Sequence, residues 1–104
     1  MIHTHQIPRD MQQGLLSLPE HMRDGVADYI FFGIEPGGFL YAILSNDLYG
    51  ACRRADDINA VCIFAYMFFL HNYAPSECFG SEERVQAWTK KRGLVGAEQE
   101  KAAR

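Results

Sequence analysis

The chain has few of the features from which a function can be read directly. Its three cysteines cannot all pair, and no Cys-x-x-Cys, HExxH, GxGxxG or GxxxxGK spacing occurs. We therefore expect reduced thiols and a cytoplasmic setting. Positive charge is also scarce: the net charge is −3 at pH 7 and the pI is about 5.7. This balance disfavours binding to duplex nucleic acid or to an anionic membrane.

Long hydrophobic runs are absent as well. The longest, Ala60–Leu70, is far shorter than the roughly 20 residues that span a bilayer. The first ten residues, MIHTHQIPRD, lack the basic and then apolar pattern of a signal peptide. A chain of 104 residues that is 48% hydrophobic has room for one core. We expect a soluble, intracellular protein with a single domain over residues 15–93, and flexible segments at 1–14 and 94–104.

Apolar residues recur at helical spacing, and no segment alternates as a strand does. The sequence therefore predicts an all-α fold, a compact bundle of four to five short helices around a central apolar helix. Ser17 and Glu20 have the spacing of a capping box, so the first helix should start at Ser17. Gly33 should end this helix. Phe31 falls on its polar side, where we expect it to be exposed and to contact a partner.

A second helix is predicted to start at Gly37. Its buried side should consist of Leu40, Ile43, Leu44, Leu48 and Ala51. Asp47 lies at the edge of that side, where an unpaired carboxylate is costly. Either the helix breaks at Ser45–Asn46, with a polar residue capping a new short helix, or Asp47 pairs with Arg53 or Arg54. The break is the favoured alternative.

The third predicted helix runs from Asp56 to Asn72 and is apolar on every side. Such a helix is normally surrounded by protein. Three other short helices offer little surface to cover all of it. Two alternatives therefore stay open: central burial, or burial in a homo-oligomer with Phe64 and Phe68 as interface residues. The fourth helix should start at Ser81 and end at Gly93.

The candidate ligand-binding residues follow the turn between the first two helices. They are Gly37, Gly38, Tyr41, Tyr49, Arg53 and Arg54. Glycines before a helix leave amide groups open to an anion, and Tyr and Arg side chains can stack on a base or pair with a phosphate. The plainer interpretations are a tight interhelical turn, an ordinary amphipathic face, and a solvated cluster of Arg53 and Arg54 with Asp56 and Asp57.

Catalytic and metal-binding patterns are weak. His21 and His71 fall on different predicted helices, without an acidic residue at ligand spacing. Cys78 lies in a loop, but nothing nearby would act as an activating base, so an inert packed thiol is expected. The sequence predicts neither an enzyme nor a metal or cofactor site.

The run PGGFLYAILSNDL is followed by RRADD, HNYAPSECFGS and a tryptophan in the last helix. With its PGGFL, SNDL and RAD blocks, the stretch from about Leu18 to Trp88 resembles a family of small uncharacterised proteins encoded by phages and prophages. The resemblance implies a small intracellular phage accessory protein and lends no reaction, cofactor or catalytic residue. By association, it also implies a role against host defence.

Three hypotheses follow for a non-enzymatic phage accessory protein. The first is sequestration of a phosphorylated small molecule, such as a nucleotide immune signal. The second is a protein–protein inhibitor of a host defence complex, resembling an anti-CRISPR protein, with Phe31, Tyr41 and Tyr49 as exposed contacts. The third is a structural or regulatory phage protein that only dimerises.

Overall fold

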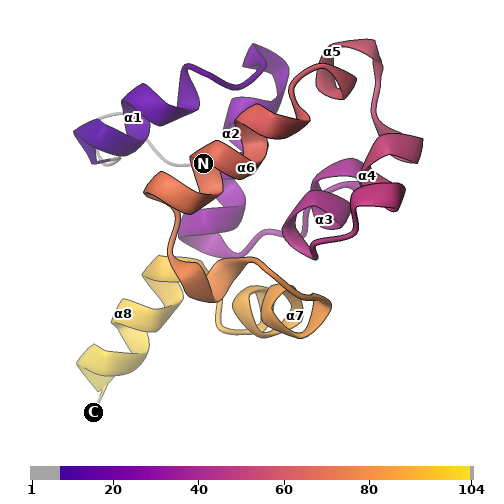
Figure 1. Cartoon of the computed structure of the whole chain (residues 1–104). Helices are drawn as coiled ribbons and strands as arrows, with labels where there is room; N and C mark the ends of the chain where they lie inside the picture. The colour runs from indigo at the N-terminus through magenta and orange to yellow at the C-terminus, as the bar shows by residue number, and fades with distance from the viewer. Residues whose placement is uncertain (1–7, 104) are drawn as a thin grey trace.

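The computed structural model describes residues 8–103, and over this range the chain is all-α, with no strand (Figure 1). Eight α-helices form, where four to five were predicted. In chain order they are α1 (Arg9–Leu15), α2 (Glu20–Phe32), α3 (Gly38–Leu44), α4 (Leu48–Arg54), α5 (Asp57–Ala60), α6 (Ile63–Tyr73), α7 (Glu82–Lys90) and α8 (Gly93–Ala103), with the 3-10 turn η2 (Ser76–Cys78) before α7. Within that range no helix combines the length and hydropathy needed to cross a membrane.

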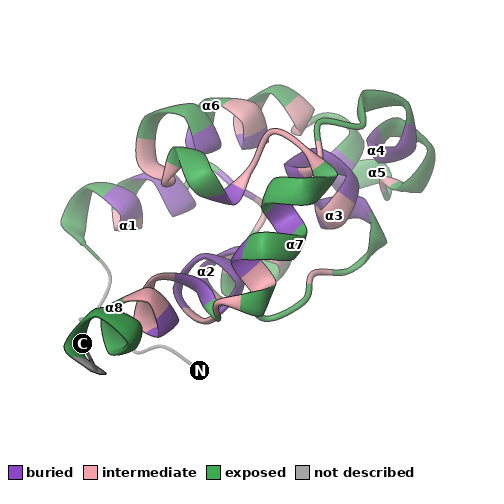
Figure 2. Ribbon diagram, turned by 90° about the horizontal axis from the view of Figure 1, so that it is seen from below, coloured by how far each residue is buried: buried purple, intermediate pink, exposed green. Residues whose placement is uncertain are grey.

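The apolar helix predicted over Asp56–Asn72 is neither continuous nor central. It divides into α5 and α6, because the amide of Cys62 closes α5 with a bond of 3.0 Å to the carbonyl of Asn59. The buried Tyr66 hydroxyl then donates to Oδ1 of Asn59 at 2.6 Å, which fixes α5 against α6. Figure 2 shows α6 along one edge of the molecule, with exposed residues on its outer side.

The start of α2 also differs from the prediction. No capping box forms at Ser17: its hydroxyl donates to the carbonyl of Gly14 at 2.6 Å, so Ser17 closes α1 instead. Pro19 precedes the first residue of α2, and no side chain caps this helix. The C-terminal end was predicted correctly, since Gly33 has the left-handed φ of 64° that ends α2.

The break predicted in the second helix is confirmed. Asn46 has a φ of 65° and separates α3 from α4. The carboxylate of Asp47 accepts a bond of 2.9 Å from the amide of Gly50, so Asp47 is the N-cap of α4. Because α4 takes a new direction, Leu48 does not extend the buried side of α3 and is exposed, contrary to the prediction.

Both segments predicted to be flexible contain helices. The N-terminal one includes α1, which packs on α6, while residues 1–7 lie outside the described range. Gly93 starts α8 rather than only ending α7, and α8 packs on α2. Phe31, near the end of α2, is therefore buried at 7% exposure and is not the exposed contact that we expected.

Two buried hydrogen bonds tie the C-terminal half of the chain to α2. The Tyr29 hydroxyl donates to the carbonyl of Cys78 at 2.7 Å, and the indole N–H of Trp88 donates to the carbonyl of Tyr29 at 3.0 Å. All three side chains are at most 2% exposed. These long-range bonds fix η2 and α7 on the core. The predicted start of α7 is confirmed, because Ser81 Oγ accepts from the amide of Arg84 at 3.2 Å.

The contact between Gly33 and Gly93 gives a prediction about stability. Gly93 has a φ of 67°, and a Cβ on it would lie 2.7 Å from the backbone nitrogen of Gly33. We expect Gly93→Ala to lower the free energy of unfolding by about 2 kcal/mol, measured by urea denaturation. Gly25, inside α2 with nothing within 4 Å of such a Cβ, is the control, and Gly25→Ala should raise stability by about 0.5–1 kcal/mol. Equal stability of Gly93→Ala and the unsubstituted chain would contradict this packing.

Candidate functional site

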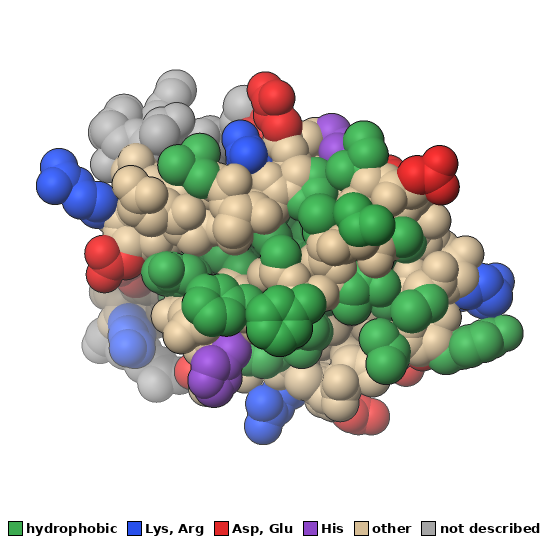
Figure 3. All heavy atoms as spheres, turned by 45° about the horizontal axis from the view of Figure 1, so that its top comes forward, with side chains coloured by type: hydrophobic (Ala, Val, Ile, Leu, Met, Phe, Trp, Pro, Cys, Tyr) green, Lys and Arg blue, Asp and Glu red, His purple; other side chains and the backbone are tan. Residues whose placement is uncertain are grey.

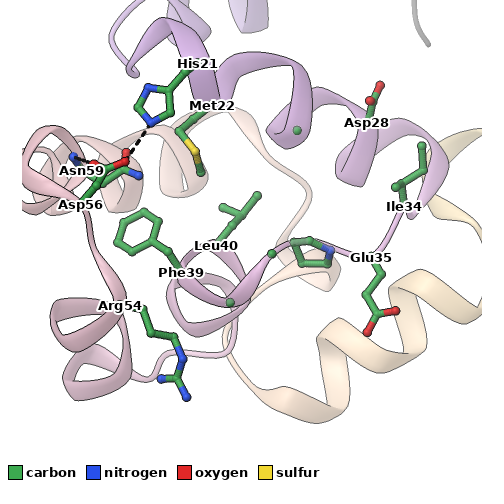
Figure 4. Close-up of a pocket in the computed structure, with 14 residues that line it drawn as sticks. His21, Met22, Asp28, Ile34, Glu35, Phe39, Leu40, Arg54, Asp56 and Asn59 are labelled. Atoms are coloured by element: carbon green, nitrogen blue, oxygen red, sulfur yellow. Dashed lines mark hydrogen bonds and ion pairs between the residues drawn. The ribbon is translucent and has the colours of Figure 1, made fainter.

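A cleft of about 400 Å³ lies between α2, the turn before α3, and α4 and α5 (Figure 4). Met22, Phe39 and Leu40 point toward its middle and make it apolar (Figure 4). The backbone of Pro36–Gly38 forms one wall. The cleft thus combines an apolar floor with a rim of polar groups, as binding clefts for small molecules commonly do.

The charge of the rim is mainly negative. Asp28, Glu35 and Asp56 line the cleft, and Arg54 is the one Lys or Arg among the described residues that line it. One carboxylate oxygen of Asp28 is buried without a hydrogen-bond partner. A second cleft of about 570 Å³ lies on the other side of the Pro36–Gly38 turn and also combines Arg54 with three acidic residues, Glu35, Asp47 and Glu82. Both clefts therefore oppose the entry of an anion more than they favour it.

The six candidate ligand residues are only partly brought together. Gly37, Gly38 and Arg54 line the first cleft, and Tyr41 lines the second. Tyr49 and Arg53 line neither, because the break before α4 separates them from the face of α3 that carries Tyr41. Arg54 lies over Gly38 and donates to the carbonyl of Gly50 at 3.3 Å, so its guanidinium is partly committed to the fold.

The predicted cluster of two arginines and two aspartates does not form within the described structure. Asp56 pairs with His21 instead, at 3.1 Å between Oδ2 and Nε2. Oδ1 of Asp56 accepts from the amide of Asn59 at 2.6 Å and caps α5. That backbone bond, followed by the contact with His21, lowers the pKa of Asp56 below its ordinary value. Sequence alone gave no signal for this pair, since 35 positions separate its members.

Nucleophilic chemistry finds little support in the described residues. The His21–Asp56 pair resembles the orienting half of a catalytic dyad, but no Ser, Thr, Cys or Lys is found among the described residues of its cleft. Cys78 is fully buried, and burial raises the pKa of its thiol to about 12, as expected for an inert packed cysteine. Over residues 8–103, no three His, Cys, Asp or Glu side chains are grouped so that they could hold a metal ion.

A second candidate surface is the outer side of α5, of α6 and of the turn between them, which we call the apolar stripe. It consists of Ile58, Val61, Phe64 and Phe68. Val61 is 85% exposed, Phe64 79% and Phe68 51%, whereas the neighbouring Phe69 is only 1% exposed. The rings of Phe64 and Phe68 lie side by side, with centroids 6.3 Å apart. Two of the three predicted interface residues, Phe64 and Phe68, therefore share one exposed surface, and Phe31 does not.

The stripe belongs to a segment without charge. From Ile58 to Leu70 the sequence contains no Asp, Glu, Lys or Arg. Figure 3 shows a face of the molecule on which hydrophobic side chains gather in the middle while charged side chains lie toward the margin. Isolated exposed hydrophobic residues are ordinary, but a contiguous group edged by polar residues is typical of an interaction site. Ile58 and Val61 were not among the predicted interface residues, although the uncharged sequence around them was the available signal.

Comparison with models of known protein families, with curated proteins and with solved structures found no match for this chain. The resemblance to phage-encoded proteins therefore stays a prediction.

The lowered pKa of Asp56 predicts a dependence of stability on pH. A carboxyl whose pKa is lower in the folded state stabilises that state above its ordinary pKa of 3.8, and this contribution is lost as the pH falls through the lowered value. Asp56→Asn keeps an oxygen that can cap α5 but removes the charge. We expect this variant to be less stable than the unsubstituted chain at pH 7, and the difference to shrink below about pH 3.

Urea denaturation at several pH values measures this difference. Asp57→Asn is the matched control, because Asp57 caps no helix and forms no ion pair in the described structure. A deficit for Asp56→Asn that stays constant between pH 7 and pH 3 would show that the charge of Asp56 does not stabilise the fold.

Proposed function

We propose that this chain acts by binding another protein through the apolar stripe, without catalysing a reaction. The observation that carries the proposal is the exposure of Val61, Phe64 and Phe68 in one uncharged segment. Burying such side chains against a partner is favourable by about 25 cal/mol per Å² of apolar surface. Because aromatic residues often dominate the energy of protein contacts, Phe64 and Phe68 are the expected centre of the interface.

The contrast between the two sides of α6 supports this assignment. On the inner side, Tyr66, Phe69 and Leu70 are at most 2% exposed and belong to the core. The outer side is equally apolar, but it contributes little to that core. Folding therefore gives no reason for large apolar side chains at Phe64 and Phe68, whereas binding does.

The resemblance to phage-encoded proteins favours a particular setting for this activity. A small accessory protein that binds without catalysis could block a host defence complex, or could be a structural or regulatory component of the phage. Both roles require the same exposed surface. Of the aromatics first expected to make such contacts, Phe31 is buried, Tyr41 is half-buried and Tyr49 is exposed on α4. The apolar stripe therefore replaces them as the proposed contact surface.

Co-precipitation with a tagged chain tests the proposal. The bait is presented both with an extract of host cells and with a second, differently tagged copy of this chain. We expect a stoichiometric complex with the unsubstituted chain. Its recovery should fall at least tenfold with the double variant Phe64→Ala/Phe68→Ala, because this variant removes both exposed rings. Tyr49→Ala, an exposed aromatic outside the stripe, is the matched control and should bind normally.

Unfolding by urea completes this test. The double variant should stay within about 1 kcal/mol of the unsubstituted chain, since substitutions of exposed side chains have small effects. Recovery of every bound protein at an unchanged level, from a folded double variant, would refute the stripe as the binding surface.

A second candidate function is capture of a phosphorylated small molecule, such as a nucleotide signal, in the cleft. The specific support is that Gly37, Gly38 and Arg54 lie together there, with His21 on the same rim. The acidic residues of the rim argue against tight binding. We place this candidate second for that reason.

Calorimetric titration with cyclic oligonucleotides and ADP-ribose derivatives separates the two functions. If the cleft binds such a ligand, Arg54→Ala should weaken binding at least tenfold, and Arg53→Ala, which changes an exposed arginine outside both clefts, should not. No heat of binding and no change in melting temperature with any of these compounds would exclude the second candidate.

A further inference from the structure

We infer that the partner of the apolar stripe is a second copy of this chain, with the two α6 helices packed antiparallel across a two-fold axis near Phe64. The inference rests on the proposed function and identifies its partner. Three observations carry it: the spacing of the exposed residues, the absence of charge along the stripe, and the position of Asp57 at one of its ends.

The spacing of the stripe fits a facing helix. Phe64 and Phe68 are four residues apart on α6, so they follow one side of its turns, and the exposed Val61 ends α5 three residues before Phe64. Exposed apolar residues at this spacing form the seam along which two helices pack. The shape of the stripe therefore favours a helix as its occupant.

The absence of charge favours a copy of the same chain. Electrostatic complementarity selects a foreign partner and steers its approach, but no Asp, Glu, Lys or Arg lies between Ile58 and Leu70. Two identical uncharged surfaces can meet without repulsion between like charges. Homodimer interfaces are also more apolar than interfaces between different proteins. One association event then covers the exposed side of α6 in both copies.

The ends of the stripe decide its direction. Asp57 lies in the first turn of α5, and His71 in the last turn of α6. A parallel pair would bring the two Asp57 carboxylates to the same end, where they would repel each other. An antiparallel pair places the two Asp57 carboxylates at opposite ends and opposes the two helix dipoles. With the axis near Phe64, Val61 of one copy then lies close to Phe68 of the other.

The area of the stripe sets the expected strength. Phe64 and Phe68, at 79% and 51% exposure, present roughly 200–300 Å² between them. The whole stripe is on the order of 500 Å² per copy, so the dimer would bury about 1,000 Å² in total, near the lower limit for a specific interface. We therefore expect a weak, reversible dimer with a Kd on the order of 10 µM.

Sedimentation velocity of the full chain, from about 1 µM to about 1 mM, tests the inference. The weight-average mass should rise from the 11.8 kDa of one copy toward twice that value. Phe64→Glu would bring two like charges together at the axis and should raise the Kd at least tenfold. Ile34→Glu is the matched control, because Ile34 is exposed to the same 51% as Phe68 but lies in the loop after α2, and it should dimerise normally.

Circular dichroism tests whether Phe64→Glu is folded, and Phe68→Glu is used in its place if it is not. A mass of one copy at every concentration, or undiminished association of the folded variant, would overturn the inference. A monomer that still binds another protein through Phe64 would leave the proposed function standing without this partner. A monomer that binds nothing through Phe64 would remove both.

Disulfide trapping tests the antiparallel direction. In a chain with Cys52→Ser and Cys62→Ser, Val61→Cys and Phe68→Cys are made separately, tagged differently and mixed under mild oxidation. Antiparallel packing should give mainly the mixed disulfide between the two variants. Parallel packing would instead join each variant to itself, and that result would contradict the assigned geometry.

Discussion

α6 buries only one of its sides, in a core to which α1 and α3 contribute. On that side Phe39 meets Tyr66 edge to face, at 5.3 Å between ring centroids, and Phe69 packs beside Tyr73 at 5.7 Å. On the opposite side Phe64 has no covering helix among the described residues. The fold therefore leaves apolar side chains of α6 exposed, and the proposed binding activity follows from this exposure.

Local signals made part of this fold predictable. Gly33 ends α2 in the left-handed conformation, Ser81 caps α7, and the polar residues around Asp47 break the second helix, as expected from short-range rules. Long-range contacts decided the rest. α8 packs on α2, the helix in which Phe31 is buried, and a bond from Tyr66 to Asn59 joins α6 to α5. Local periodicity reveals neither contact.

The candidate site shows the same division between local and long-range information. The turn at Gly37 and Gly38 was recognised from local sequence, and Arg54 does lie beside it. The partnership of Asp56 with His21 joins elements far apart in the chain and could not be foreseen. The apolar character of α6 was evident from sequence, but not which side would stay exposed, because that depends on where α1 and α3 pack.

The proposed binding activity depends on the exposure of the Phe64 and Phe68 rings, and NMR can measure this exposure directly. A soluble paramagnetic agent added to dilute protein with labelled phenylalanine relaxes ring protons according to their access to solvent. The seven phenylalanines of the chain supply internal controls. The structure predicts strong relaxation at Phe64 and Phe68 and weak relaxation at Phe31 and Phe69. Rings at Phe64 and Phe68 as protected as that of Phe69 would contradict the account.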